Sequence, residues 1–255
     1  MNHPRGTFPE RRPYLFVLLL ELLVVAVFLL AGTLDHVLQL GGGLRMYALA
    51  NAILTGLVAL VITRLRWWGR VGFRPAGRRQ LLWVLPMAVP VLLNAYPGLD
   101  PGGPVAVAGF LGLALLVGFV EEAVFRGLML RTLERLGVGR AVAITTVLFS
   151  VTHLMNVMAG ESTFQAVLQL AYTAAIGFAF TAYALRAGTI WPLIVVHALI
   201  DFVAFLQDAT IQVPPVVEIT TAVVVTVGFT AYGAWLLTRP SPVSAAAREA
   251  VAAAR

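Results

Sequence analysis

The chain has 255 residues, of which 60% are hydrophobic and only 12% are charged, and its mean hydropathy is +0.89. Soluble domains carry about a quarter charged residues, so this composition excludes a soluble domain that must cover a water-facing surface. The net charge of +6 comes entirely from arginine, and the absence of cysteine excludes disulfides and thiolate metal sites.

Eight apolar runs predict membrane-crossing helices, because a crossing needs about 20 mostly apolar residues. The first run follows three arginines, but it is too long for the apolar core of a secretory signal peptide and no small-residue cleavage site follows it. We therefore expect an all-α membrane protein, a bundle of about eight transmembrane helices, with a single membrane domain over residues 1–240 and a short cytoplasmic tail over 241–255. The runs lie at residues 14–31, 46–63, 80–96, 105–130, 141–158, 164–185, 190–206 and 216–238.

The arginines alternate between the loops that join these runs. Six arginines lie between the second and third runs and three between the fourth and fifth, whereas Arg45 is the one basic residue in the loops of the other side. The positive-inside rule then predicts a cell-membrane protein with both termini in the cytoplasm, which requires an even number of crossings. The basic composition is therefore explained by the placement of arginines in the loops of a membrane protein. We expect membrane lipid as a partner and do not expect nucleic acid.

Ionisable residues gather within the predicted membrane helices, where they are costly and usually functional. Glu21 lies near the cytoplasmic end of the first helix, and we expect a structural role for it. Glu122 and Arg126 are four residues apart on one helix face, which predicts a salt bridge and leaves Glu121, about 100° round the helix, available for chemistry. The other ionisable residues in the predicted helices are His153, His197 and Asp201.

Depth along the helices suggests that these groups form one site. His153 and Asp201 each lie roughly 20 Å from the cytoplasmic start of their helix at 1.5 Å per residue. Taken singly, a buried histidine is more often a hydrogen-bonded core residue, and a His197–Asp201 pair can simply join helices at about 0.6 kcal/mol. Their shared depth instead predicts that Glu121, His153 and His197 meet around one water-accessible cavity that opens to the cytoplasmic half of the membrane.

Three motifs, in this order, resemble the CAAX-protease and bacteriocin-processing family of intramembrane proteases, also called CPBP or ABI, which includes the type II CAAX prenyl endopeptidases. The resemblance covers about residues 105–205. Each motif alone is unspecific, but their order, spacing and placement on separate helices make the set strong. The motifs are Glu-Glu-x-x-x-Arg at Glu121, Glu122 and Arg126, Phe-x-x-x-His at Phe149 and His153, and His-x-x-x-Asn/Asp at His197 and Asp201.

The resemblance implies an intramembrane endopeptidase, a hydrolase that cuts CAAX-type, lipidated, or leader-like and signal-like peptides. Glu121 would be the general base on a water molecule and His153 would assist it. His197 and Asp201 would stabilise the oxyanion. The remaining motif residues would support this site: Glu122, Arg126 and Phe149.

One position departs from the prenyl endopeptidases that the chain resembles, because Asp201 stands where they have asparagine. An ionised carboxylate cannot donate a hydrogen bond to an oxyanion, so Asp201 is either protonated or orients His197. Glu121, His153, His197 and Asp201 are also a plausible ligand set for zinc. The zinc signature His-Glu-x-x-His is absent, so we expect no metal cofactor and keep zinc as the alternative.

Two other classes of protein would also gather acids and histidines in a membrane. A proton-coupled transporter is one, but the sequence has no internal repeat that would indicate an inverted-repeat architecture. A non-catalytic immunity or scaffold protein that keeps the same fold is the other. Loss of function on replacing Glu121 separates an enzyme from a scaffold.

Overall fold

The computed structural model describes residues 6–39, 43–158 and 162–239. Every predicted run forms helix, and the described residues contain no β-strand, only an isolated bridge between Leu99 and Gln207. The all-α expectation is confirmed. In chain order the elements are α1 (Phe8–Arg11), α2 (Pro13–Leu38), α3 (Leu44–Leu65), α4 (Trp68–Val71), α5 (Arg78–Val84), the 3-10 helix η1 (Leu85–Ala88), α6 (Val89–Ala95), α7 (Pro104–Glu121), the π-helix η2 (Glu122–Met129), α8 (Leu130–Leu133), the 3-10 helix η3 (Glu134–Leu136), α9 (Val138–Thr152), α10 (Met155–Met158), α11 (Thr163–Ala187), α12 (Trp191–Phe205) and α13 (Pro215–Leu237).

Six of the described helical segments are long and apolar enough to cross a membrane. The other two predicted crossings are shorter. The seventh run forms α12, with 15 residues, and the third is divided into α5, η1 and α6, where Pro86 and Pro90 each remove a backbone donor. Eight crossings therefore remain a prediction. The six long segments are Pro13–Leu38, Leu44–Leu65, Pro104–Leu136, Val138–Val157, Thr163–Ala187 and Pro215–Leu237.

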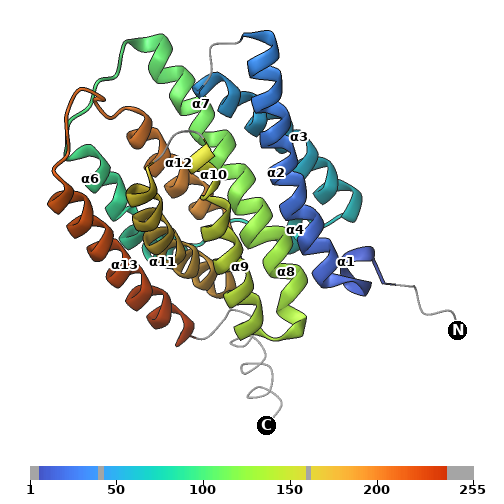
Figure 1. Cartoon of the computed structure of the whole chain (residues 1–255). Helices are drawn as coiled ribbons and strands as arrows, with labels where there is room; N and C mark the ends of the chain where they lie inside the picture. The colour runs from blue at the N-terminus through green and yellow to red at the C-terminus, as the bar shows by residue number, and fades with distance from the viewer. Residues whose placement is uncertain (1–5, 40–42, 159–161, 240–255) are drawn as a thin grey trace, which may run out of the picture.

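The arginine-bearing loops come together at one end of the molecule, here called the arginine end. Arg135 donates to the carbonyl oxygen of Pro9 at 3.4 Å, and Arg186 donates to that of Leu237. The beginning of α2 and the end of α13 lie at this same end (Figure 1), as an even number of crossings requires. Which membrane face this end occupies remains a prediction, and the predicted tail lies outside the described residues.

Two loops are joined at the opposite end. The amide of Asp100 donates to the carbonyl of Leu206 at 2.8 Å, and the amide of Asp208 donates to the carbonyl of Gly98 at 3.2 Å. These bonds tie the α6–α7 connection to the α12–α13 connection. We call this end, which also carries the α2–α3 connection, the opposite end.

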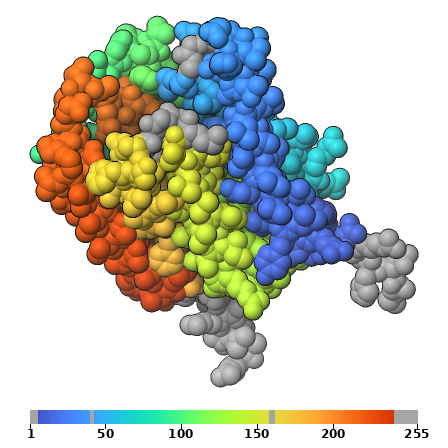
Figure 2. All heavy atoms as spheres, in the orientation of Figure 1, coloured from blue at the N-terminus to red at the C-terminus, as the bar shows by residue number. Residues whose placement is uncertain are grey.

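The helices pack through small residues and expose apolar ones. A Cβ on Gly233 of α13 would lie 2.6 Å from the ring of Phe178 on α11, so glycine permits this close approach. Outward-facing side chains such as Leu22, Leu92 and Val105 are more than half exposed, as expected for surfaces that face lipid. Figure 2 shows α2, α9 and α13 covering one such face.

Glu10 anchors α1 to the arginine end. Its carboxylate accepts from the guanidinium of Arg70 at 2.9 Å and from the amide of Thr7 at 2.8 Å. These hydrogen bonds, that of Arg70 foremost, lower the pKa of Glu10 from 4.5 to about 2.

Glu10→Gln is therefore expected to be slightly less stable than the wild type at neutral pH. A carboxylate with a lowered pKa stabilises the fold above its unfolded value, so the difference should be constant above about pH 5. It should shrink as the pH falls toward 2. Thermal unfolding of both proteins in detergent across this range measures it, and a difference that grew on acidification would contradict the assignment.

Candidate active site

A close approach between α7 and α12 creates the site. A Cβ on Gly118 would lie 2.8 Å from the carbonyl oxygen of Ile194, closer than real Cβ atoms come to backbone, and 3.2 Å from the amide nitrogen of Ala198. Glycine is therefore needed at this crossing. One turn further along each helix, Glu122 and His197 face each other.

Glu122 is the centre of a buried polar cluster. Its Oε1 accepts from Nη1 of Arg126 at 3.0 Å, and both side chains are fully buried. The predicted salt bridge is thus confirmed. The same oxygen lies 2.7 Å from Nδ1 of His197. Because a carboxylate paired with arginine can only accept, this nitrogen carries a proton.

Arg126 is held between aromatic rings and hydrogen-bond acceptors. Its guanidinium lies 3.9 Å from the ring centroid of Phe149 and 5.3 Å from that of Phe180, in cation–π geometry. Nη2 also donates to the carbonyl of Gly177 at 3.5 Å. Two aromatic rings and the carboxylate of Glu122 therefore hold the guanidinium in place. Because Glu122 also bonds to His197, the same contacts orient the imidazole ring of His197.

The second nitrogen of His197 faces two carboxylates. Nε2 lies 3.6 Å from Oε2 of Glu121 and 3.6 Å from Oδ2 of Asp201. Both carboxylate oxygens are buried and make no hydrogen bond to any described residue. Buried oxygens of this kind are acceptors for a water molecule or for a polar group of a substrate. The shortest anionic contact of His197 is to Glu122, and not to Asp201 as its i,i+4 spacing suggested.

His153 lies at the end of α9 with its ring fixed. Its Nδ1 is 2.7 Å from the carbonyl oxygen of Phe149, which can only accept, so Nδ1 donates. The Phe149 and His153 rings are also in contact, with centroids 4.8 Å apart. This arrangement sets the tautomer, with the proton on Nδ1 and the lone pair on Nε2 when the ring is neutral.

Two cavities meet at the site. One of about 500 Å³ lies beside α2, and one of about 720 Å³ extends between α6, α11, α12 and α13. Glu121, His153 and Tyr47 line both of them, and His197 and Asp201 line the larger. The four predicted catalytic residues are therefore brought to one place.

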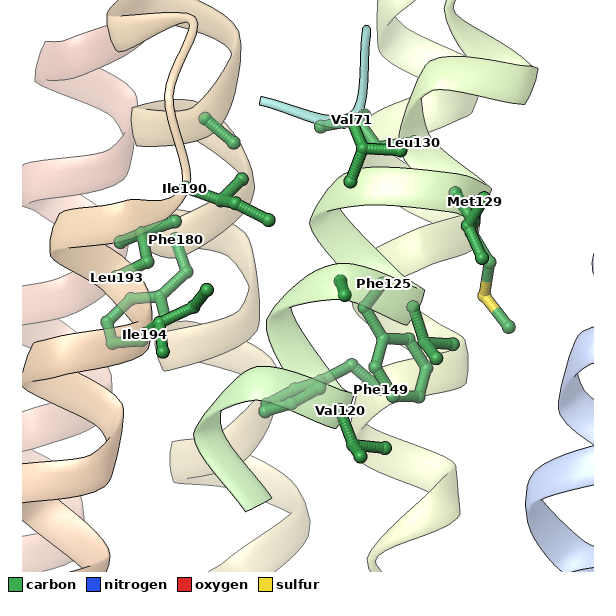
Figure 3. Close-up of a cluster of buried hydrophobic side chains, with 14 of the residues drawn as sticks. Val71, Val120, Phe125, Met129, Leu130, Phe149, Phe180, Ile190, Leu193 and Ile194 are labelled. Atoms are coloured by element: carbon green, nitrogen blue, oxygen red, sulfur yellow. The ribbon is translucent and has the colours of Figure 1, made fainter. Parts of the chain in front are cut away.

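The direction of the cavities differs from the sequence-based expectation. Both run from the site toward the opposite end, where His36 lines the smaller cavity and Tyr96 and Gln207 line the larger. We expected a cavity that opens to the cytoplasmic half, to which the positive-inside rule assigns the arginine end. The space between the site and the arginine end is instead filled by a cluster of buried apolar side chains, part of which Figure 3 shows.

The partner of Glu21 and the position of Tyr47 near the site were not predicted from the sequence. Glu21 accepts a hydrogen bond of 2.5 Å from the hydroxyl of Thr152, next to His153, and so links α2 to the end of α9. Tyr47 was missed, although Tyr47 and Asn51 form a polar i,i+4 pair inside an apolar run, and the amide of Asn51 donates to the Tyr47 carbonyl at 3.0 Å. A polar pair at this spacing could have been used to predict that this face of the helix lies near the site.

The zinc alternative requires a set of side chains arranged as metal ligands. The Nδ1 atoms of His197 and His153 are bonded to Glu122 and to a carbonyl, which leaves their Nε2 atoms as the imidazole nitrogens that a metal could use. Among the described residues, no group of three or more histidine, aspartate or glutamate side chains is arranged to hold a metal ion. We therefore derive no step through a metal, and chelation remains the test.

The fold and the site together define a class: a multi-pass α-helical membrane protein with carboxylates and imidazoles facing cavities inside the helix bundle. Residues 103–203 match the family described as type II CAAX prenyl endopeptidase Rce1-like. This segment contains every residue of the three motifs, so the match confirms their resemblance to this protease family. Comparison with curated proteins and with solved structures gave no match.

Proposed function

We propose that the protein is an intramembrane endopeptidase in which Glu121 activates the hydrolytic water. The single observation that supports this most directly is the position of Glu121 and His153, which both line the two cavities. A general base must reach both water and a peptide. The match to a protease family supports the reaction class.

The proposed reaction follows from the positions of the acids and imidazoles. Glu121 takes a proton from a water molecule, with Nε2 of His153 as second acceptor, and the water oxygen attacks the carbonyl carbon of the scissile bond. The carbonyl π electrons move to its oxygen. When this tetrahedral intermediate collapses, the C–N bond breaks and the proton held by Glu121 passes to the leaving amine.

His197 is the proposed donor to the oxyanion. With Nδ1 bonded to Glu122, only Nε2 can face the reacting carbonyl. That nitrogen must then carry a proton too, which makes the ring an imidazolium. The carboxylates of Glu121, Glu122 and Asp201, all within 3.6 Å of the ring nitrogens, favour this charged form. A charged donor offsets the missing asparagine amide at position 201.

Asp201→Asn tests this role for His197. We expect the variant to retain substantial peptidase activity, because the amide supplies a neutral donor. Its pH optimum should move to lower pH, since the imidazolium loses one of its anionic neighbours. The pH profile of cleavage by purified protein in lipid vesicles, compared with that of the wild type, measures both effects.

The metal alternative makes the reverse prediction for the same variant. If Asp201 were a zinc ligand, Asp201→Asn would lose activity and added zinc would partly restore it. Chelation of the wild type would also abolish cleavage reversibly. Full metal occupancy of the purified protein, with activity lost on chelation and regained with zinc, would overturn the metal-free mechanism.

A further inference from the structure

The route from the site to the arginine end is closed by packed side chains. Figure 3 shows apolar side chains of η2, α8 and α9 on one side and of α11 and the start of α12 on the other, facing each other. None of the labelled side chains is more than 4% exposed, so this region is apolar and buried. The labelled residues are Val71, Val120, Phe125, Met129, Leu130, Phe149, Phe180, Ile190, Leu193 and Ile194.

The α4 segment completes this closure. Val71 is fully buried against η2, and a Cβ on Gly127 would lie 2.3 Å from Cγ1 of Val71, so glycine makes room for it. The carbonyl of Gly72, which follows, accepts from the amide of Ile190 at 3.0 Å. The loop after α3 is therefore bonded to the start of α12 across the arginine end.

The other direction is open. The larger cavity continues from Asp201 past Ala204 and Asn94 to Tyr96 at the opposite end, where the Tyr96 side chain is 79% exposed. Its described lining includes the carboxylates of Glu121, Asp201 and Glu218 and no arginine. The lining is otherwise mostly apolar, and its three carboxylates without an arginine suit an extended neutral or basic polypeptide better than an acidic one.

The charge distribution assigns a membrane face to the entrance. Arginines lie in or next to the α3–α5, η3–α9 and α11–α12 connections at the arginine end. In or next to the connections at the opposite end, the described positions carry Asp35, Asp100 and Asp208, with Arg45 as their one arginine. The positive-inside rule places the arginine end in the cytoplasm. The open end is then extracytoplasmic.

We infer that substrate enters from the extracytoplasmic face, and that the substrate class is a neutral or basic polypeptide segment presented there, such as a part of an exported or membrane-anchored protein. The assignment of a substrate rests on the proposed endopeptidase function. The sidedness of the cavity does not depend on it.

Cysteine labelling tests the sidedness, since the chain has no cysteine of its own and any introduced thiol is unique. Ala204→Cys places a thiol within the larger cavity and Tyr96→Cys places one at its mouth. Val138→Cys, 49% exposed at the arginine end, is the matched control. The probe is a membrane-impermeant, positively charged methanethiosulfonate, applied to right-side-out and to inverted membrane vesicles.

We expect both cavity thiols to react in right-side-out vesicles and the Val138→Cys thiol to react only in inverted ones. The reverse pattern would overturn the inference and leave the proposed peptidase activity standing. Reaction at Tyr96→Cys but at Ala204→Cys from neither side would show that the cavity is closed to water, which would also overturn it. Conversely, if cleavage proves independent of Glu121, the proposed function fails while the labelling result still reports the open face.

Discussion

Replacing Glu121 by glutamine is expected to lower peptide cleavage by at least about 100-fold, the lower end of what a positioned general base contributes. The amide keeps the size of the side chain but cannot take a proton from water. Because Oε2 of Glu121 makes no hydrogen bond to a described residue, little structure depends on it. Cleavage of an internally quenched peptide by purified protein in lipid measures the rate, and thermal unfolding should be nearly unchanged.

Glu134→Gln is the matched control, because it makes the same chemical change in a partly exposed residue paired with Arg131 at the arginine end. It should cleave at the wild-type rate. The cellular counterpart is a comparison of the membrane peptides that accumulate with wild type and with Glu121→Gln. If Glu121→Gln keeps the full cellular phenotype, the protein is a scaffold. If the wild type cleaves no peptide but takes up protons, and Glu121→Gln loses this uptake, the protein is a transporter.

Arg126→Ala is expected to destabilise the protein by about 3–5 kcal/mol, the range found when one partner of a buried ion pair is removed. The substitution leaves Glu122 fully buried without its guanidinium and removes the cation that lies over Phe149. Because Glu122 also holds His197, activity should fall together with stability. Thermal or denaturant unfolding in detergent, read beside the cleavage rate, measures both.

Arg70→Ala is the control for this second experiment. It breaks an ion pair with Glu10 in which the two side chains are 37% and 29% exposed, and such surface pairs contribute at most about 1 kcal/mol. Its activity should be that of the wild type. If Arg126→Ala unfolded like the wild type yet lost activity, Arg126 would instead contact the substrate or the reacting atoms.

Much of the site could be predicted because its physics is local. Ionisable residues inside apolar runs are rare enough to stand out, and i,i+4 spacing alone sufficed for the pair of Glu122 and Arg126. The all-α fold followed from hydropathy in the same way. The shared location of Glu121, His153 and His197 rested on depth along separate helices, and the cavity lining agrees with it.

What could not be predicted depends on contacts between distant segments. The bond from His197 to Glu122, rather than to Asp201, requires the close crossing at Gly118, which no local pattern reveals. The direction of the cavities could not be predicted, because helix depth fixes the level of a residue but not on which side of it the space is filled by other side chains. Val71 and Ile190, which help to fill that side, lie far apart in the sequence. For Glu21 a structural role was expected, and its hydrogen bond with Thr152 on α9 agrees with that, but the identity of this partner could not be predicted from the sequence.

The π-helix from Glu122 to Met129 makes the site sensitive to chain length as well as to composition. A π-helix closes its hydrogen bonds over five residues instead of four, so its turn holds an additional residue. A substitution in η2 changes one side chain and leaves the number of residues in the segment unchanged. Deleting Ala123, a buried residue of η2, would let the segment relax to an ordinary α-helix, because a π turn is an α turn with one inserted residue. The helices on either side would keep their relative rotation, but Glu122 and Arg126 would stand three positions apart instead of four, so the buried ion pair depends on the number of residues in this one segment.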